Sequence, residues 1–172
     1  VISLAVFMIL TRLLDTHSLG LLQLGTLVVA FVQAFATQGF ADALIQREKL
    51  TEEHLNSAFW LNLLVGGILT IATMVLADDI AWICREPELA DVIWWLSLSF
   101  VLYGISSIQR TMMMRNLDFS LPSMILLASD VIGGLVGIGM ALAGKGVWSL
   151  VAQFMVTRIA YVILFTIWTP WW

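Results

Sequence analysis

The sequence predicts an all-α membrane protein, a polytopic bundle of about six transmembrane helices, and three observations support this prediction. Hydrophobic residues make up 60% of the 172 residues, and the mean hydropathy is +0.97. Charged residues make up only 12%, whereas about a quarter of the residues in an ordinary soluble domain are charged. Uncharged runs of about 20 residues, long enough for a helix to cross a bilayer, recur along the chain. Transmembrane β-strands would instead be short segments in which apolar and polar residues alternate.

The first two predicted spans cover residues 1–12 and 19–40. Residues 1–12 are too few to cross a bilayer, and because the sequence starts with Val inside an apolar run, we expect this helix to be truncated. We do not expect a secretory signal peptide, since the run has no basic n-region and no cleavage site. The second span contains no Asp, Glu, Lys or Arg, and Asp15, Thr16 or Ser18 can cap its start.

The third and fourth predicted spans cover residues 55–77 and 90–110. Thr51 followed by two Glu residues is typical of a helix N-terminus, where acidic side chains favour the positive end of the helix dipole. We expect residues 78–91 to form a polar link between these two spans. Pro87 in this link suits the first turn of the next helix, because an amide hydrogen has no partner there.

The fifth and sixth predicted spans cover residues 120–143 and 146–169. The sequence Ala143-Gly144-Lys145-Gly146 between them predicts a tight turn, so the two spans form an antiparallel hairpin.

The links between spans differ little in positive charge. The second and fourth links carry Arg47, Lys49, Arg110 and Arg115, and the other links carry Arg12, Arg85 and Lys145. Loops rich in Lys and Arg face the cytoplasm in membrane proteins. The small difference predicts that the second and fourth links are cytoplasmic, together with both ends of the chain.

Asp130 and Arg158 are the only Asp, Glu, Lys or Arg residues deep within the predicted spans. They lie almost equally far from the turn at Gly144 and Lys145, so at about 1.5 Å per residue they come within roughly 2 Å of the same depth. Each is costly in hydrocarbon by itself, at about 2.5–3.5 kcal/mol. Three interpretations stay open: a salt bridge that locks the hairpin, a charged lining of a water-filled cavity, or exposure of either residue to lipid.

Uncharged polar residues form a second group inside the spans. Gln33 and Asn62 lie almost equally far from the middle of the second link, so they also share a depth. Gln153 lies about one and a half turns from Arg158 on the sixth span. Hydrogen bonds between helices explain such residues, and ligand binding is the alternative.

Small residues recur at every fourth position on the fifth predicted span. They are Ser129, Gly133, Gly137 and Ala141. Positions four apart share a helix face, and small side chains on that face let a second helix approach closely. Gly66 and Gly67 predict a weaker form of the same packing in the third span. Flexibility for a rocking motion is the alternative role of these glycines.

The remaining residues indicate no enzyme, no cofactor and no metal site. Cys84 is the single cysteine, and His17 and His54 are the only histidines, which is too few for a thiol pair or a cluster of metal ligands. The sequence has no glycine-rich phosphate loop, no metalloprotease helix motif and no nucleophile elbow. The net charge of −4 offers no basic patch for nucleic acid. We therefore expect no catalytic residue and no nucleic-acid partner.

Four segments, in chain order, carry a resemblance to a known family. They are Thr11-Arg12-Leu13-Leu14-Asp15, ALIQREKLTEEHLNSAFWLN at residues 43–62, EPELADVI at residues 86–93 and GKGVWSLVAQ at residues 144–153. The chain resembles the polysaccharide transporter family of the multidrug/oligosaccharidyl-lipid/polysaccharide flippase superfamily, which includes lipopolysaccharide, colanic-acid and teichuronic-acid exporters. The similarity extends over nearly the whole chain, and residues 43–62 are its most specific part.

This resemblance implies two facing lobes of about six spans each, with residues 1–172 as the N-terminal lobe and a missing C-terminal lobe as its partner. It implies a carrier in the bacterial plasma (inner) membrane that moves undecaprenyl-diphosphate-linked oligosaccharide across the bilayer by alternating access. Basic residues that face the cavity are expected to bind the diphosphate or acidic sugars. Arg158 matches such a position, and Arg12 lies at the outer end of the first span.

We therefore expect six residues to line a substrate cavity. They are Arg158, Asp130, Arg12, Gln33, Asn62 and Gln153. Two other functions stay open. One is a cation-coupled drug antiporter of the same superfamily, with Asp130 as its ion site, and the other is a non-transporting membrane scaffold for a glycan polymerase or synthase.

Overall fold

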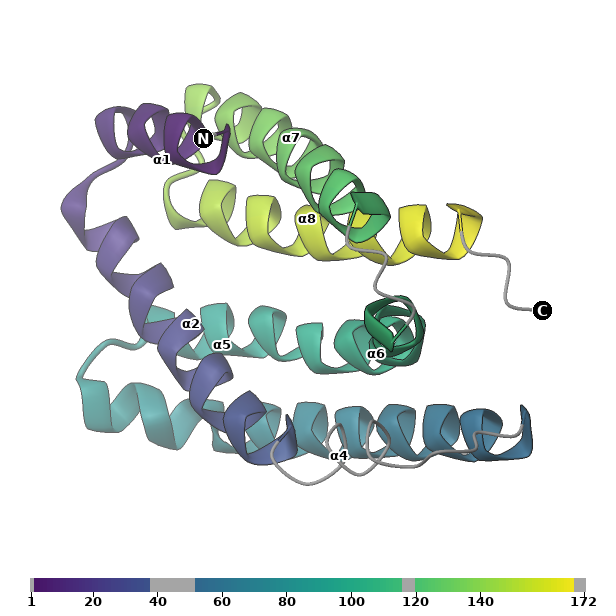
Figure 1. Cartoon of the computed structure of the whole chain (residues 1–172). Coiled ribbons are helices and arrows are strands. Elements are labelled where there is room, and N and C mark those ends of the chain that lie inside the picture. The colour runs from purple at the N-terminus through teal and green to yellow at the C-terminus, as the bar shows by residue number, and fades with distance from the viewer. Residues whose placement is uncertain (1, 38–51, 116–119, 169–172) are drawn as a thin grey trace.

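Seven α-helices make up the part of the chain that the computed structural model describes, residues 2–37, 52–115 and 120–168, and no β-strand occurs there. The helices are α1 (Ile2–Leu13), α2 (Thr16–Thr37), α4 (Glu52–Cys84), α5 (Glu88–Ser97), α6 (Ser99–Arg115), α7 (Ser120–Leu142) and α8 (Val147–Trp168) (Figure 1). The predicted all-α class is confirmed.

Five segments of the described residues are long and apolar enough to cross a membrane. They are Thr16–Ala34, Asn56–Cys84, Glu88–Ser107, Ser120–Leu142 and Val147–Trp168. These segments overlap the second to the sixth predicted spans, and the shorter α1 lies at the first. The chain is a multi-pass membrane protein.

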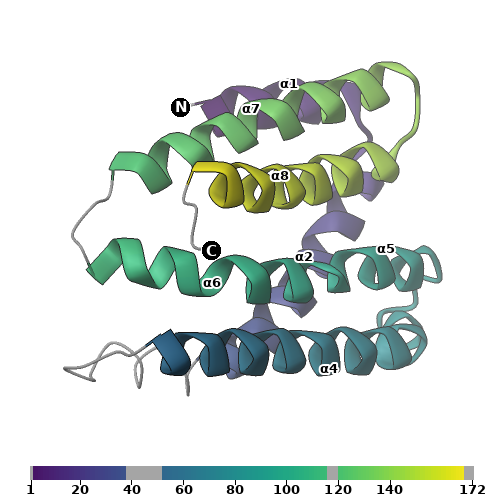
Figure 2. The ribbon, with the colours of Figure 1, turned by 90° about the vertical axis from the view of Figure 1, so that its right-hand side faces the viewer.

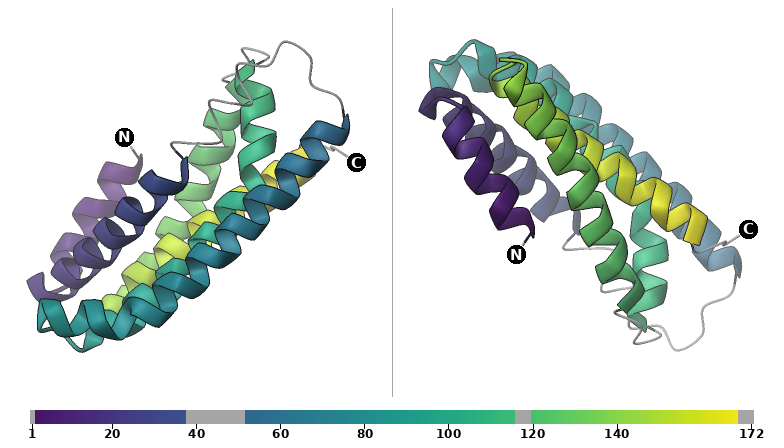
Figure 3. Two further views of the ribbon diagram at one scale, coloured as in Figure 1. Left: turned by 90° about the horizontal axis from the view of Figure 1, so that it is seen from below. Right: turned by 90° about the horizontal axis from the view of Figure 1, so that it is seen from above.

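The helices are stacked so that α8 lies at the centre of the bundle. It packs against α7 on one side and against α5 and α6 on the other, and α4 covers the far side of α5 and α6 (Figure 2). α1 packs on α7, while α2 crosses from the α1 end to contact α5 and α8 (Figure 3). This arrangement brings α2, α6, α7 and α8 together around the middle of α8.

Helix α4 is longer than its predicted span. We expected a polar link from residue 78, but the helix continues through exposed Asp78 and Asp79 to Cys84. Charged side chains end an apolar run without breaking a helix, because Asp and Trp are tolerated in helices at small cost. Trp82 in this extension is 81% exposed, as expected of an aromatic residue at a membrane interface.

The predicted fourth span is broken into two helices at Leu98. α5 ends at Ser97, α6 begins at Ser99, and the Leu98 amide bonds to the Trp95 carbonyl at 3.3 Å, in the tighter spacing of a 3₁₀ turn. On α4, the Thr70 hydroxyl lies 2.9 Å from the Gly66 carbonyl of its own helix and 3.0 Å from the Ser97 carbonyl across the helix interface, so its single hydrogen serves both acceptors. The break is thus supported by a neighbouring helix, which is how backbone irregularity is tolerated inside a membrane.

The start of α2 is capped by Asp15, one of the three residues expected there. Its carbonyl accepts the Leu19 amide at 3.3 Å, and its carboxylate accepts the hydroxyl of Ser18. The Ser18 hydrogen bond, with further contributions from backbone amides and His17, holds the pKa of Asp15 below its ordinary value. The cap is therefore strongest when this carboxylate is ionised.

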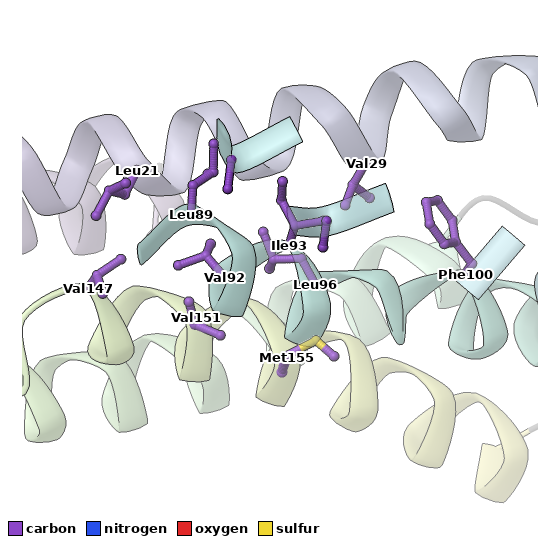
Figure 4. Close-up of a cluster of buried hydrophobic side chains, with 12 residues drawn as sticks. Leu21, Val29, Leu89, Val92, Ile93, Leu96, Phe100, Val147, Val151 and Met155 are labelled. Carbon is purple, nitrogen blue, oxygen red and sulfur yellow. The ribbon is translucent and has the colours of Figure 1, made fainter. Parts of the chain in front are cut away.

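The main apolar core joins α2, α4, α5, α6 and α8. Figure 4 shows Val92, Ile93 and Leu96 of α5 between Leu21 of α2 and Val151 of α8. All five side chains are buried. By contrast, large apolar side chains on the outer faces of α4, α7 and α8 are exposed, including Ile71, Leu135 and Ile163. A lipid bilayer covers such faces, so α5 is the buried helix and the other three border lipid.

Candidate functional site

The candidate site begins with the close packing of α7 on α8. A Cβ added at Gly133 would lie 2.8 Å from the backbone oxygen of Gln153, and one added at Gly137 would lie 2.8 Å from the Gln153 Cβ. Both distances are shorter than real Cβ contacts, so only glycine permits this approach. Ser129 and Ala141 are buried on the same face. The predicted small-residue stripe is therefore the packing face of the hairpin.

One pocket, of about 300 Å³, lies between α2, α7 and α8. Asp130 and Arg158 both line it, so the hairpin brings the two intramembrane charges to one place. Gln153 and Gln23 add uncharged polar groups to a lining that is otherwise mainly apolar. Asp130 is half-buried and Arg158 is exposed. We call this pocket, defined by Asp130, Arg158, Gln153 and Gln23, the charged pocket.

The guanidinium of Arg158 lies over an aromatic ring. Its Cζ is 5.1 Å from the ring centroid of Phe154, which also lines the charged pocket. A cation within about 6 Å of an aromatic face is attracted to the ring quadrupole. This contact orients the guanidinium along the pocket wall.

A second pocket, of about 240 Å³, lies between α2, α6, α7 and α8. Six of its lining residues carry hydroxyl groups and a seventh carries an amide: Ser99, Tyr103, Ser106, Ser107, Ser123, Tyr161 and Gln33. We call it the hydroxyl pocket. Arg158 and Leu126 line both pockets. Arg158 therefore stands where the two pockets meet, close to the middle of α8.

Asn62 and Arg12 are not among the residues that line these two pockets. Asn62 donates a hydrogen bond of 3.1 Å from Nδ2 to the hydroxyl oxygen of Ser107, so it holds a residue of the hydroxyl pocket across the interface between α4 and α6. Arg12 is exposed in the last turn of α1. The predicted site residues that the structure brings to the pockets are Arg158, Asp130, Gln33 and Gln153.

Comparison with known proteins places the chain in a family. The family model described as "Polysaccharide biosynthesis protein" matches residues 9–172. The chain belongs to the polysaccharide biosynthesis protein family. This match confirms the resemblance to the polysaccharide transporter family that the sequence shows. No solved structure is significantly similar to the chain.

Several curated proteins are similar to this member of the polysaccharide biosynthesis protein family. The lipopolysaccharide biosynthesis protein WzxC of Escherichia coli is 32% identical over 117 residues, which are 68% of this chain and 24% of WzxC. The succinoglycan biosynthesis transport protein ExoT of Rhizobium meliloti is 26% identical over 151 residues, 88% of this chain and 31% of ExoT. The teichuronic acid biosynthesis protein TuaB of Bacillus subtilis is 31% identical over 102 residues, 59% of this chain and 21% of TuaB. The chain thus matches less than a third of the length of each relative.

Sequence reasoning does not single out the hydroxyl pocket of this polysaccharide biosynthesis protein. A single hydroxyl in an apolar helix looks the same in sequence whether it bonds its own helix or faces a pocket, and Ser106 does bond the Leu102 carbonyl of its own helix at 3.1 Å. The sequence does contain one indication of this pocket, the spacing of four hydroxyl residues in α6. Ser99, Tyr103, Ser106 and Ser107 follow the i, i+4, i+7, i+8 spacing of one helix face.

Proposed function

We propose that this chain forms part of a membrane exporter that moves a lipid-linked saccharide across the bacterial plasma membrane for cell-surface polysaccharide synthesis. Its relatives are named for lipopolysaccharide biosynthesis, succinoglycan biosynthesis transport and teichuronic acid biosynthesis. The observation that carries the proposal is the position of Arg158, a cation at the junction of two pockets that hold most of the polar side chains found between α2, α6, α7 and α8. A saccharide joined to a prenyl lipid by diphosphate supplies both an anion and polar groups for these pockets.

Arg158 is the proposed contact of the diphosphate. A guanidinium forms paired, charge-assisted hydrogen bonds with phosphate oxygens, and these bonds are stronger in a medium of low dielectric constant. Asp130 lines the charged pocket, and none of the described residues that line the hydroxyl pocket is acidic. The anion would therefore approach Arg158 from the hydroxyl pocket. Asp130 would offset the cost of holding Arg158 in the membrane from the other side.

The prenyl tail of the substrate would stay outside the protein, in the hydrocarbon of the bilayer. The outer faces of α4, α7 and α8 expose apolar side chains such as Ile71, Leu135 and Ile163, so hydrocarbon surrounds the bundle. A prenyl chain is soluble in that hydrocarbon, whereas a saccharide is not. The head group would cross within the protein while the tail remains in the bilayer.

At the scale of the whole transporter, we propose that residues 1–172 form one six-span lobe that faces a second lobe of the same protein. The greater length of the relatives supports this division, since the chain matches 21% to 31% of them. Rocking of two lobes about a site between them would give alternating access. We place the second and fourth links at the cytoplasm, where a glycan polymerase or synthase would be a further partner.

A transport assay on the full-length protein tests the proposal. In proteoliposomes, the wild-type protein should move undecaprenyl-diphosphate-linked oligosaccharide from one leaflet to the other. Arg158→Gln should lower the initial rate roughly 10-fold to 100-fold, because a hydrogen bond to a charged group contributes about 1.5–3 kcal/mol. Arg158→Lys should retain part of the rate, since it keeps the charge but not the paired geometry.

Lys145→Gln is the matched control, because it removes a cation that is exposed in the turn after α7. It should transport at the wild-type rate. A wild-type rate for Arg158→Gln at equal protein abundance would show that the cation has no part in transport.

A cation-coupled antiporter is the second candidate, and the half-buried carboxyl of Asp130 in the charged pocket favours it. Such an antiporter requires an intramembrane acid that exchanges ions. If this candidate is right, transport of a cationic drug should depend on a proton or sodium gradient, and Asp130→Asn should abolish that dependence. Transport of the lipid-linked saccharide without any gradient would favour the first proposal.

A further inference from the structure

The break at Leu98 lies near the middle of the membrane-spanning segment Glu88–Ser107. Leu98 has a φ of −57° and a ψ of −21°, which are the values of a 3₁₀ turn. Regular bonding to the carbonyl four residues earlier resumes with Leu102, whose amide lies 3.4 Å from the Leu98 carbonyl. A 3₁₀ turn in the middle of a helix often marks a hinge.

A side chain from another helix occupies a position in the interrupted ladder of backbone bonds. In a continuous helix, the Ser97 carbonyl would accept the Val101 amide four residues later. Here this carbonyl lies 3.0 Å from the Thr70 hydroxyl of α4, and no backbone amide of the described residues bonds to it. A side chain inserted in this way is a known cause of a helix kink. Thr70 therefore stabilises the bent form.

The hydroxyl of Ser99 lacks a partner in the bent form. Its oxygen is buried and makes no hydrogen bond among the residues that the structure describes. Ser129 and Ser106, which lie within unbroken helices, donate to the carbonyl four residues earlier at 2.8 and 3.1 Å. For Ser99 that carbonyl belongs to Trp95, which accepts the Leu98 amide in the 3₁₀ turn. Because buried hydroxyls are rarely left unpaired, a straight helix would supply the bond that Ser99 lacks.

The two halves of the segment are held to different degrees. In α5, the side chains of Val92, Ile93 and Leu96 are fully buried in the main apolar core, and the helix packs against α2, α4 and α8. In α6, Leu102 and Tyr103 are only half-buried, and the helix packs against α4 and α8. α6 is therefore the half that is freer to move.

The contact between α6 and α4 is compatible with such a movement. The atoms nearest to a Cβ added at Gly66 or Gly104 belong to the backbone of the facing helix. Small sliding of packed helices is a common form of conformational change, and a contact made by backbone atoms requires no change of rotamer when one helix slides.

We propose that the segment Glu88–Ser107 is hinged at Leu98 and alternates between the bent form seen here and a straight form. In the straight form the Ser99 hydroxyl donates to the Trp95 carbonyl, and the Ser97 carbonyl accepts a backbone amide again. Five residues of α6 line the hydroxyl pocket, and none of the described residues that line it belongs to α5. A tilt of α6 on a fixed α5 thus changes the width of this pocket. The inference goes beyond the proposed function, because it does not depend on what the pocket carries.

Amide hydrogen–deuterium exchange on the full-length protein in nanodiscs tests the hinge. It is measured by mass spectrometry with single-residue fragmentation at Ser99, Phe100 and Val101, whose amides gain carbonyl partners in the straight form. Thr70→Val removes the inserted hydroxyl and keeps the shape of the side chain. It should slow exchange at these amides roughly twofold to tenfold, the change in population that one neutral hydrogen bond gives.

A second substitution should act in the opposite direction. In the double variant Thr70→Val with Ser99→Ala, the rate should return towards the wild-type value, since the straight form no longer gains the Ser99 bond. Thr70→Ser retains the hydroxyl and should exchange as the wild type does. Thr166→Val is the matched control, because Thr166 donates to a carbonyl of its own helix, α8, at 2.8 Å. It should leave exchange in α5 and α6 unchanged.

The direction of the change separates a hinge from a fixed kink. Faster exchange in Thr70→Val would show that Thr70 only holds two helices together, and the hinge would be wrong. An unchanged rate in Thr70→Val, or a double variant that exchanges as slowly as Thr70→Val, would also overturn it. These outcomes leave the proposed function untouched, since the transport assay tests that function separately.

Discussion

Arg85 shows how a single residue at a helix end carries strain. It follows α4 with a φ of 59°, the only positive value among the non-glycine residues that the structure describes. The Arg85 amide bonds to the Trp82 carbonyl at 3.1 Å and the Glu86 amide to the Ala81 carbonyl at 3.0 Å. This is the Schellman pattern, in which glycine is preferred because a Cβ is disfavoured at positive φ.

The end of α7 has the same pattern with the preferred residue. Gly144 has a φ of 72°, its amide bonds to the Ala141 carbonyl at 3.0 Å, and the Lys145 amide bonds to the Met140 carbonyl at 3.2 Å. The two ends therefore form a natural comparison between arginine and glycine in one backbone conformation.

Arg85→Gly should raise the free energy of unfolding by about 0.5–1 kcal/mol, because it removes the cost of a side chain in the left-handed region. Gly144→Ala should lower it by about 1 kcal/mol or more for the opposite reason. Unfolding in mixed detergent micelles, followed by circular dichroism, measures both changes. A loss of stability in Arg85→Gly would mean that the arginine side chain, rather than the backbone conformation, is what holds this turn.

At the level of helices, α4 and α6 approach each other through two glycines. A Cβ added at Gly66 would lie 2.7 Å from the carbonyl oxygen of Phe100, and one at Gly104 would lie 2.9 Å from the carbonyl oxygen of Asn62. Both obstacles are backbone atoms, which cannot move as a side-chain end can. The predicted packing role of Gly66 is confirmed, whereas a Cβ at Gly67 would meet nothing within 4 Å.

Gly66→Ala should therefore destabilise the protein by about 1–3 kcal/mol, the usual cost of overpacking. Gly67→Ala, at the adjacent position of the same helix, should be neutral or slightly stabilising because alanine has the higher helix propensity. Thermal unfolding of the two variants in the same detergent compares them directly. Equal melting temperatures would show that α4 and α6 do not meet at Gly66.

The helices themselves were largely predictable, but their interruptions were not. Uncharged runs locate the spans because charged groups are costly in hydrocarbon. The same rule misplaces the end of α4, since Asp78 and Asp79 end the apolar run while the helix continues to Cys84. The break at Leu98 has no glycine or proline to mark it, and the hydroxyl that lies 3.0 Å from the Ser97 carbonyl beside it belongs to Thr70 of another helix.

In the whole molecule, only part of the site could be predicted, for a reason specific to membranes. Asp130 and Arg158 belong to a hairpin with a short turn, so residue counting places them at one depth, and they line one pocket. The hydroxyl pocket requires residues from four helices. In a bilayer both the packed and the lipid-covered faces of a helix are apolar, so hydrophobic periodicity does not reveal which faces meet.

We propose that the two pockets around Arg158 are the water-accessible interior of a bundle that lipid covers elsewhere. Thr157 lines the charged pocket, whereas Ile159 lies two residues away on α8, is 43% exposed and is not among the pocket-lining residues. The two positions have nearly the same depth in the membrane. They differ in the medium that we expect around them, which is water at Thr157 and hydrocarbon at Ile159.

We therefore test it by labelling single cysteines in the full-length protein, with Cys84 and every other native cysteine replaced by serine. A charged, membrane-impermeant thiol reagent reacts with the thiolate, which forms in water and not in hydrocarbon. We expect that Thr157→Cys is labelled in intact proteoliposomes, that added lipid-linked saccharide slows the reaction, and that Ile159→Cys remains unlabelled. Equal labelling of the two cysteines, or labelling of Ile159→Cys alone, would contradict it.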